Sequence, residues 1–288
     1  MRVLVTGANG QLGRDLVEVC TAAGDDVVAA GRAELDVGDR DAVASCVEGV
    51  RPDVIVNCAA WTAVDACESD PARAQRDNAD AVRWLRAAAD RVGAHLVQIS
   101  TDYVFSGDLD RPYRETDTTG PRSVYGHTKL AGELAAGPEA TIVRTSWVCG
   151  EHGANMVKTV LRLLAGGPPE LTFVADQRGN PTFTTDLAGR VRELAAARAQ
   201  GVFHATNAAT GADGAPGVSW YEFVCEIVSA AGGDPSIVRP ITTAELQPPR
   251  PAARPANSVL ADTQLAPLRD FRAPLGELVA RLQTRPNG

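Results

Sequence analysis

Short apolar runs alternate with helical patterns over the first half of the chain. The apolar run at 2–7 is followed by Leu12, Leu16, Val19 and Cys20, which recur at helical spacing. This order predicts a strand and then a helix, and it is repeated up to about residue 146. The further expected strands are 26–31, 52–60, 95–100 and 140–146, and the further expected helices are 39–50, about 70–92 and one that contains Tyr125. Continuous apolar strands separated by helices predict an α/β fold with a doubly wound parallel sheet that helices cover on both faces.

The second half of the chain is less regular. Proline and glycine are frequent at 166–169 and 211–217, and 239–258 contains too much proline for a central strand or a long helix. A helix near 186–198 and a strand at 201–206 nevertheless return to the pattern of the first half. We therefore expect a second, smaller lobe beside the main sheet domain.

The expected division of the chain places two segments in each lobe. The larger domain comprises 1–147 and about 179–205 and contains the parallel sheet. The smaller C-terminal lobe comprises about 148–178 and 206–288 and is expected to bind the substrate. Only the tail after about 280 is expected to be disordered.

Composition narrows the classes of partner and compartment. The 288 residues carry a net charge of −8 with acidic and basic side chains mixed, which disfavours nucleic acid and anionic membranes as partners. No apolar run approaches the roughly 20 residues that cross a bilayer, and the first strand begins without a signal-peptide pattern, so we expect a cytoplasmic protein. The six cysteines show no CxxC spacing and the four histidines form no cluster, so we expect reduced thiols and predict no metal ligands.

The glycine-rich stretch TGANGQLG lies between the first strand and the first helix. It places Gly7, Gly10 and Gly13 three residues apart, where the amides of a helix N-terminus can bind a pyrophosphate. Gly7 would allow a tight turn, Gly10 a close approach of the ligand, and Gly13 the packing of helix against strand. A glycine trio alone can be only a turn, and its spacing differs from GxGxxG. Its position after the first strand nevertheless predicts a dinucleotide site of the Rossmann type.

The end of the second strand bears on which dinucleotide is bound. Many NAD enzymes place an acid there for the ribose hydroxyls, whereas this chain has Gly31 and Arg32. An arginine can pair with a 2′-phosphate, so NADPH is favoured as the cofactor. NADH stays an alternative because Glu34 is nearby. Asp36 and Val37 are expected to flank the adenine.

A second group of candidate residues combines Thr101, at the end of a strand, with Tyr125 and Lys129 on the following helix. Residues four apart share a helix face, so the ammonium group can lie near the phenol. A nearby positive charge lowers the pKa of a tyrosine, which is near 10 in a free side chain. Such a tyrosine can exchange a proton with a carbonyl or alcohol oxygen near neutral pH.

Lysine is scarce in this chain, which makes the position of Lys129 informative. Lys129 and Lys158 are the only lysines among 28 basic residues. Lysine offers a compact, titratable charge that arginine does not, so Lys129 is expected to have a specific role. Taken alone, a Tyr and Lys pair at this spacing is commonly a solvated helix face.

Together with the glycine loop, these residues resemble the short-chain dehydrogenase/reductase family, in its extended branch that acts on nucleotide sugars. The resemblance implies that Thr101 hydrogen-bonds the substrate oxygen and that Tyr125 is the catalytic acid or base. It also implies that Lys129 binds the nicotinamide ribose and lowers the pKa of the tyrosine. The expected cofactor-binding residues are then Gly7, Gly10, Gln11, Leu12, Gly13, Arg32, Asp36, Val37, Ala59, Ala60, Trp61, Ile99, Tyr125 and Lys129.

Within that branch, long ordered stretches are similar to the dTDP-4-dehydrorhamnose reductase family. They include GANGQLG, NCAAWTAVDACE, STDYVFSG, YGHTKLAGE, RTSWVCG, DQRGNPTFTTDLA, SWYEF and RPANSVLAD. The resemblance implies transfer of hydride from NADPH to the C4 ketone of dTDP-4-dehydro-L-rhamnose, which gives dTDP-L-rhamnose in the last step of its biosynthesis. This small nucleotide sugar is expected to contact Thr101, Asp102, Tyr103, Tyr125, Trp147, Arg254 and Asn257.

Several alternatives stay open at this point. A nucleotide-sugar epimerase or dehydratase of the same branch would keep a tightly bound NAD, which Gly31 and Arg32 disfavour. A non-catalytic NADP-binding regulatory subunit is the alternative from another class, and the intact catalytic residues argue against it. Some members of the family are magnesium-linked dimers that use an acid in the first helix, where this chain has Asp15. The use of Mg²⁺ is therefore left open, as is the choice between monomer and homodimer, and His127 has no assigned role.

Overall fold

The computed structural model describes residues 1–284, and positions 285–288 lie outside the described residues. The last described element is helix α10 (Arg272–Thr284). The expectation of disorder after about 280 is wrong for 281–284, because Leu278 and Val279 are buried in the core of the smaller lobe and Leu282 packs against that core. The remainder of the expected tail lies outside the described residues.

Six parallel strands form the main sheet in the order β10-β5-β4-β3-β1-β2. Their bounds are Arg2–Thr6 (β1), Asp26–Ala30 (β2), Val54–Asn57 (β3), His95–Thr101 (β4), Thr141–Thr145 (β5) and Gly201–His204 (β10). The chain moves outward from β1 to β2 and then returns to β3 on the other side of β1. Ligands of such sheets bind where the strand order reverses, at the carboxyl ends of the strands. The prediction of a doubly wound parallel sheet is confirmed.

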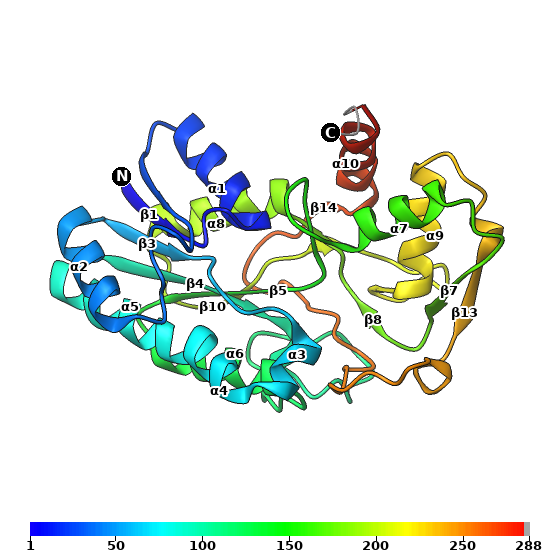
Figure 1. Cartoon of the computed structure of the whole chain (residues 1–288), viewed down its shortest axis with the longest axis horizontal. Coiled ribbons are helices and arrows are strands. Elements are labelled where there is room, and N and C mark those ends of the chain that lie inside the picture. Colours follow the sequence, from blue (N-terminus) through cyan, green and yellow to red (C-terminus); the bar gives the residue numbers. More distant parts are fainter. Residues whose placement is uncertain (285–288) are drawn as a thin grey trace.

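Helices cover both faces of the sheet (Figure 1). On one face lie α1 (Gln11–Ala22) and α8 (Thr184–Ala197), and on the other lie α2 (Arg40–Val50), α5 (Ala81–Val92) and α6 (Val124–Ala136). Successive side chains of a strand point to opposite faces. Accordingly, Val3 and Val5 of β1 pack with Leu16 of α1, whereas Leu4 packs with residues of α2 and α5.

One expected helix is interrupted. In place of a single helix over about 70–92, the chain forms α4 (Pro71–Gln75), a π-helical turn (Arg76–Asp80) and then α5, after a short preceding helix α3 (Val64–Ser69). Asn78 of the π-helical turn donates to the carbonyl oxygen of Trp61 and to the hydroxyl of Thr128, and accepts from the amide of Trp61. These tertiary contacts lie outside what helical periodicity encodes.

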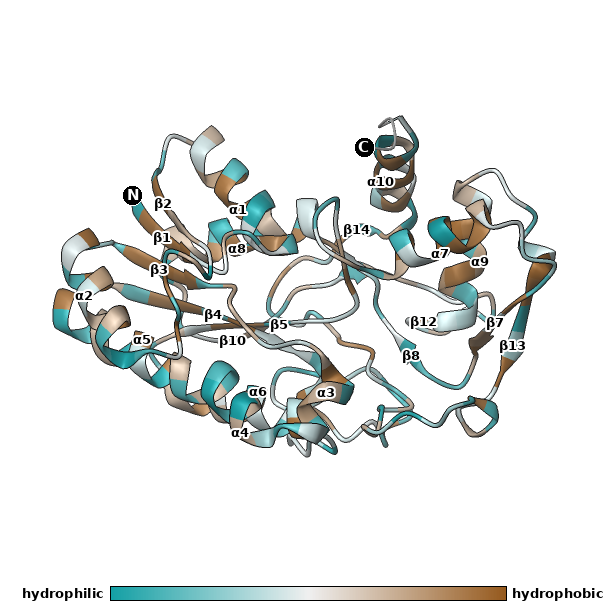
Figure 2. Ribbon diagram, viewed as in Figure 1, coloured by the Kyte–Doolittle hydropathy of each residue, from teal (hydrophilic) through white to brown (hydrophobic). Residues whose placement is uncertain are grey.

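The smaller lobe has its own apolar core between three helices and pairs of short strands. The helices are α7 (Met156–Ala165), α9 (Trp220–Ala230) and α10. The paired strands are β6 (Val148–Cys149) with β9 (Thr182–Phe183), β7 (Leu171–Val174) with β13 (Val238–Ile241), β8 (Arg178–Gly179) with β12 (Val218–Ser219), and β11 (Asn207–Ala208) with β14 (Leu268–Asp270). Figure 2 shows apolar stretches on the strands of the main sheet and on α9 and α10. The division of the chain between the two lobes stays our proposal.

Short 3₁₀ turns complete the fold at Asp102–Val104, Pro235–Ile237 and Thr243–Glu245. All six cysteines are free thiols. Among the helices of residues 1–284, none combines the length and the apolar character that a membrane span requires.

Candidate active site

Two adjoining cavities lie at the carboxyl edge of the sheet. The first has a volume of about 230 Å³ and is bounded by the glycine loop and the end of β2. The second has a volume of about 320 Å³ and is bounded by the ends of β4 and β5 and the start of α6. Cys58 and Ala60, which follow β3, line both cavities. A ligand that enters the first cavity can therefore extend into the second.

The first cavity brings together most of the expected adenosine and pyrophosphate residues. Of these, Gly7, Gly10, Arg32, Asp36, Val37, Ala59 and Ala60 line it. Asn9, Gly31, Leu35, Cys58 and Asp77 line it as well and were not among the predicted residues. Asn9 lies inside the glycine-rich stretch TGANGQLG, so the sequence could have identified it as a residue of the cofactor site.

The glycine loop has the backbone geometry that a bound pyrophosphate needs. Gly7 has φ +63°, and a Cβ atom there would lie 2.6 Å from the amide nitrogen of Ala59. Gly13 approaches the carbonyl oxygen of Gly7 so closely that any side chain would collide with it. Gly10 caps helix α1, and no side chain bonds to the free amides of this helix end. Those amides are therefore available for the oxygens of a phosphate.

Gln11 and Leu12 lie at the start of α1 but turn their side chains elsewhere. Leu12 is buried in the core. Gln11 donates to the carbonyl oxygen of Ala154 at 3.1 Å and accepts from Asn155 at 2.9 Å. Only their backbone amides face the region of a pyrophosphate, while the side chain of Gln11 ties α1 to the loop before α7 and lines the second cavity.

Glycine and arginine follow β2 where an acid would bind ribose hydroxyls. A Cβ atom at Gly31 would collide with the side-chain amide of Asn9 and would lie 2.7 Å from a carboxylate oxygen of Glu34. Arg32 is exposed and lines the cavity. Asp36 accepts a hydrogen bond of 2.6 Å from Arg76, which holds the pKa of its carboxyl below the usual range.

The second cavity brings the three expected catalytic side chains together. Thr101 ends β4, and Tyr125 and Lys129 lie on the first turns of α6. Ser123 caps α6 by accepting from the amide of Gly126 at 3.1 Å. Because Gly126 lacks a side chain, the helix packs directly against the carbonyl oxygen of Tyr103. This packing places the ring of Tyr125 over the end of β4.

Burial dominates the proton affinities of these groups. Burial raises the pKa of Tyr125. A hydrogen bond between the phenol of Tyr125 and the hydroxyl of Thr101 lowers this pKa and partly offsets the rise. Burial also lowers the pKa of Lys129 to about 8, against the opposing effect of Glu133. The ammonium group of Lys129 donates to the carbonyl oxygen of Ile99 at 2.6 Å. The expected lowering of the tyrosine pKa by the lysine is therefore not found: the pKa of Tyr125 is raised, and the group that opposes the rise is Thr101.

The sugar side of the cavity contains buried polar atoms without partners. Asp102 is only 2% exposed, and burial raises its pKa to about 6 against the effect of the nearby hydroxyl groups of Ser258 and Thr101. Its Oδ2 atom makes no hydrogen bond of standard geometry. Its Oδ1 atom accepts from Thr101 at 2.9 Å. Thr145, which is paired with Thr101 in the sheet, also has a buried hydroxyl without a partner. Buried polar groups are normally hydrogen-bonded, so these two atoms mark where a polar ligand fits.

Tyr103 and Trp147 line the same cavity, together with one residue that the sequence did not identify. Tyr103 meets Tyr125 edge to face, with ring centroids 5.5 Å apart. Trp147 stacks on Trp220, which comes from the start of α9. Trp220 lies in SWYEF, one of the stretches that carry the resemblance, but it was not assigned to the site. Thr145, by contrast, lies near the end of a predicted strand. The rule that ligands bind at strand ends, which located Thr101, could therefore have identified it.

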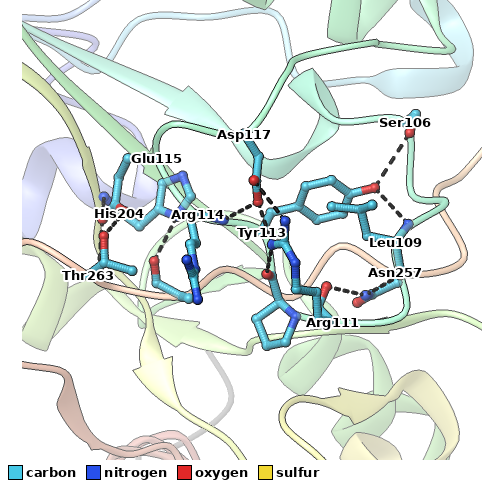
Figure 3. A network of polar contacts seen from close by, with 12 residues as sticks. Ser106, Leu109, Arg111, Tyr113, Arg114, Glu115, Asp117, His204, Asn257 and Thr263 are labelled. Atoms are coloured by element: carbon cyan, nitrogen blue, oxygen red, sulfur yellow. Dashed lines mark hydrogen bonds and ion pairs between the residues drawn. The ribbon is translucent and has the colours of Figure 1, made fainter.

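The remaining expected residues do not line the two main cavities. Arg254 forms an ion pair of 2.5 Å with Asp65 and borders a much smaller neighbouring cavity. Figure 3 shows Asn257 directed at the backbone of Leu109 and Arg111, and its Nδ2 atom donates to their carbonyl oxygens at 2.8 and 2.9 Å. Trp61 lies beside the cavity wall under the guanidinium of Arg73, which is 4.2 Å from its ring centre.

Gly13, His127 and Asp15 were also singled out in the sequence. Gly13 packs α1 onto the glycine loop. His127 is exposed on α6, whereas Tyr125 and Lys129 on the same helix are buried. Asp15 is buried in α1, and within residues 1–284 its surroundings contain no group of three or more potential metal-binding side chains.

Comparisons with known proteins agree with this arrangement. The family model described as RmlD substrate binding domain matches residues 1–284. A dTDP-4-dehydrorhamnose reductase of Streptomyces griseus is 47% identical, over 96% of this chain and 92% of its own length. A probable dTDP-4,6-dihydroxy-2-methyloxan-3-one 4-ketoreductase of Streptomyces antibioticus is 45% identical, over 96% of this chain and 94% of its own length.

A solved structure extends the similarity to the cofactor. The dTDP-4-dehydrorhamnose reductase of Bacillus anthracis, determined in complex with NADP, has a TM-score of 0.89 and 35% identity, and the match covers 97% of this chain and 99% of that protein. The resemblance seen in the sequence motifs is confirmed. The chain belongs to the dTDP-4-dehydrorhamnose reductase family.

Proposed function

We propose that this protein uses NADPH to reduce the C4 ketone of dTDP-4-dehydro-L-rhamnose to dTDP-L-rhamnose. One observation carries the proposal: Thr101 and Tyr125 line a cavity that shares Cys58 and Ala60 with the dinucleotide cavity. A ketone held between the two hydroxyl groups would therefore lie beside the reactive end of the cofactor. The dTDP-4-dehydrorhamnose reductases among its relatives support this substrate.

The first cavity fits NADPH. The uncapped amides of α1 suit the pyrophosphate, and Gly31 carries no acid for the ribose hydroxyls. Arg32 offers a cation for the 2′-phosphate. Lys129, which lines the second cavity, would hold the nicotinamide ribose. When bound, NADPH supplies the hydride for C4.

The side chains of this protein supply the proton and the orientation. Tyr125 donates its phenolic proton to the C4 oxygen as negative charge develops there. The phenol is protonated at neutral pH, as the donor in a reduction must be, because the ordinary pKa of a tyrosine is near 10 and burial raises that of Tyr125 further. Thr101 positions the same oxygen, and the unpartnered Oδ2 atom of Asp102 would accept a hydrogen bond from a sugar hydroxyl.

A second substrate of the same chemistry is supported by one relative. The Streptomyces antibioticus protein, at 45% identity, is named as a 4-ketoreductase for a different dTDP sugar. Both substrates present a C4 ketone to the same pair of hydroxyl groups. A comparison of the two ketones therefore decides the physiological substrate without changing the mechanism.

We place the reaction in the cytoplasm, where NADPH and nucleotide sugars are available, and in a monomer or homodimer. The larger domain would bind NADPH and the smaller lobe the nucleotide sugar. Sedimentation of the purified protein with and without Mg²⁺ would distinguish the two oligomeric states. A metal-dependent dimer would point to the region of Asp15, whereas a monomer under both conditions would exclude a role for magnesium in assembly.

The direct test measures NADPH oxidation with dTDP-4-dehydro-L-rhamnose and with its GDP and UDP counterparts. We expect turnover with the dTDP sugar and a loss of kcat of about 10²- to 10⁴-fold in Tyr125→Phe, with NADPH binding retained. Purified protein that carries stoichiometric NAD and does not consume NADPH would support an epimerase or dehydratase. Equal rates for wild type and Tyr125→Phe would remove Tyr125 from the mechanism.

A further inference from the structure

Trp147 lines the substrate cavity in an unusual backbone conformation. Its φ angle is +47°, in the left-handed region that bulky side chains rarely adopt. Strained residues of this kind persist where the surrounding structure holds them, and they cluster at functional sites. The residues that hold Trp147 are therefore candidates for a role in the reaction.

Two residues, Trp220 and Gly179, contact the indole of Trp147. The ring of Trp220 stacks on it with centroids 3.5 Å apart and planes 7° from parallel. A Cβ atom at Gly179 would lie 2.6 Å from Cε2 and 2.7 Å from Nε1 of Trp147. The indole is therefore held by a stacked ring and by a backbone segment that leaves no space for a side chain.

The backbone of the smaller lobe sets the positions of both residues. Gly179 of β8 pairs with Val218 of β12, and Arg178 pairs with Ser219. Trp220 follows Ser219 directly and begins α9, which Ser219 caps through a reciprocal bond with Glu222. The pairing of β8 with β12 thus sets the positions of both residues that contact the indole of Trp147.

The indole borders two cavities of very different size. With Trp220 and Tyr103, it borders the substrate cavity of about 320 Å³ and a third cavity of about 10 Å³, which is only the volume of one water molecule. A larger side chain at position 179 would collide with the indole and displace it from the position in which it bounds the substrate cavity.

We propose that Trp220 and Gly179 are positioning residues that hold the indole of Trp147 as a rigid wall of the substrate cavity. The proposal rests on the proposed function, because the wall acts by fixing the sugar ring against Thr101 and Tyr125. An apolar ring face suits the carbon-bound hydrogens of a sugar. Misplacement of a substrate by about 1 Å can cost 10²-fold in rate, so a mobile indole would reduce turnover of the sugar without altering the NADPH site.

The test is a double-mutant cycle between Gly179→Ala and Trp147→Phe. We expect Gly179→Ala alone to lower kcat/KM for the nucleotide sugar by about tenfold or more, with the Kd of NADPH unchanged. In the Trp147→Phe background the same change should alter kcat/KM by less than about threefold, because the smaller ring removes the collision. Gly189→Ala in α8, where no atom lies within 4 Å of the added Cβ, is the matched control.

A spectroscopic measurement on the protein without substrate separates this proposal from the proposed function. Stacked indoles couple in circular dichroism, so Trp147→Phe and Trp220→Phe should remove the same signal, and Gly179→Ala should change it while Gly189→Ala does not. Wild-type protein that fails to reduce the 4-keto sugar would remove the proposed function, while the spectra would still test the contact. Equal kinetic losses from Gly179→Ala in both backgrounds, or an unchanged spectrum in Gly179→Ala, would overturn the positioning role.

Discussion

The polar side chains of the reaction centre are buried, and burial shifts their pKa values. It raises the pKa of Tyr125, raises that of Asp102 to about 6 and lowers that of Lys129 to about 8. Tyr125 is thus protonated at neutral pH and ready to donate. Lys129 keeps its charge at neutral pH at a cost in folding free energy, because desolvation disfavours a buried ammonium group.

Replacing Lys129 should make the fold more stable while abolishing turnover. Its pKa falls from 10.5 to about 8 on folding, so between these pH values the unfolded chain holds the proton that the folded chain has lost. The contribution of Lys129 to stability therefore rises with pH across that window, and at pH 7 its charge costs about 3 kcal/mol or less. We expect Lys129→Met to raise the free energy of unfolding at pH 7 by about 1–3 kcal/mol. Loss of the hydrogen bond from Lys129 to the carbonyl oxygen of Ile99 reduces this gain.

Urea unfolding at pH 7 and at pH 10.5 checks this prediction. The stabilisation by Lys129→Met should shrink at the higher pH, where the wild-type lysine is neutral when folded. A variant that is destabilised equally at both pH values would show that the hydrogen bond to Ile99 matters more than the buried charge.

At the scale of elements, helix α6 is positioned by glycines that permit close contact. Gly126 packs against the carbonyl oxygen of Tyr103, and Gly132 packs against the carbonyl oxygen of Asn78 in the π-helical turn. These contacts leave no room for a methyl group. They set the height of α6 above β4 and hence the distance between Tyr125 and Thr101.

A methyl group at Gly132 should therefore destabilise the protein, although alanine favours a helix. The added Cβ would collide with the carbonyl oxygen of Asn78 and lie 3.3 Å from Cγ2 of Val82. We expect Gly132→Ala to lower the free energy of unfolding by about 1–3 kcal/mol, as measured by urea denaturation. Gly49→Ala in α2, where no atom is within 4 Å of the added Cβ, should stabilise by about 0.5–1 kcal/mol. If Gly132→Ala and Gly49→Ala both raise the free energy of unfolding, α6 can move away from Asn78 without destabilising the protein.

The elements that depend on local periodicity could be predicted, and those that depend on distant contacts could not. Alternating apolar runs identified the six strands of the main sheet, and the rule that ligands meet strand ends located Thr101. The π-helical turn was missed because Asn78 is held by Trp61 and Thr128. Helix α10 was not predicted, and its last residues were expected to be disordered, because the periodicity gave no sign of the core that Leu278 joins.

At the scale of the whole molecule, the segment 252–263 joins the smaller lobe to the sheet domain. Arg254 pairs with Asp65 on α3. Figure 3 shows two further contacts: Asn257 holds the loop at Leu109, and Thr263 donates its amide to Glu115 at 3.0 Å. The partners of each pair lie more than a hundred residues apart in the sequence. Such pairings have no local signal, which is why Arg254 was expected at the nucleotide sugar and its partner Asp65 was not predicted.

Breaking the Arg254–Asp65 pair from one side should cost more than removing both partners. Arg254 is only 8% exposed, so Asp65→Ala would leave a nearly buried charge without its partner. We expect Asp65→Ala to lower the free energy of unfolding by about 1–3 kcal/mol and Asp65→Ala/Arg254→Met to recover part of that loss. Thermal unfolding without nucleotide measures both. A double variant less stable than Asp65→Ala would show that Arg254 stabilises the lobe contact through its other bonds.

The central claim is that hydride passes from the cofactor to C4 of a dTDP-linked 4-keto sugar while Tyr125 supplies the proton. The most direct test uses NADPH deuterated at C4 of its nicotinamide ring, with dTDP-4-dehydro-L-rhamnose as substrate and NMR of the product. We expect one deuterium at C4 of the sugar in dTDP-L-rhamnose for each NADPH oxidised by wild type, and at least about a hundredfold slower transfer in Tyr125→Phe. Product without deuterium at C4, or no oxidation of NADPH, would contradict it.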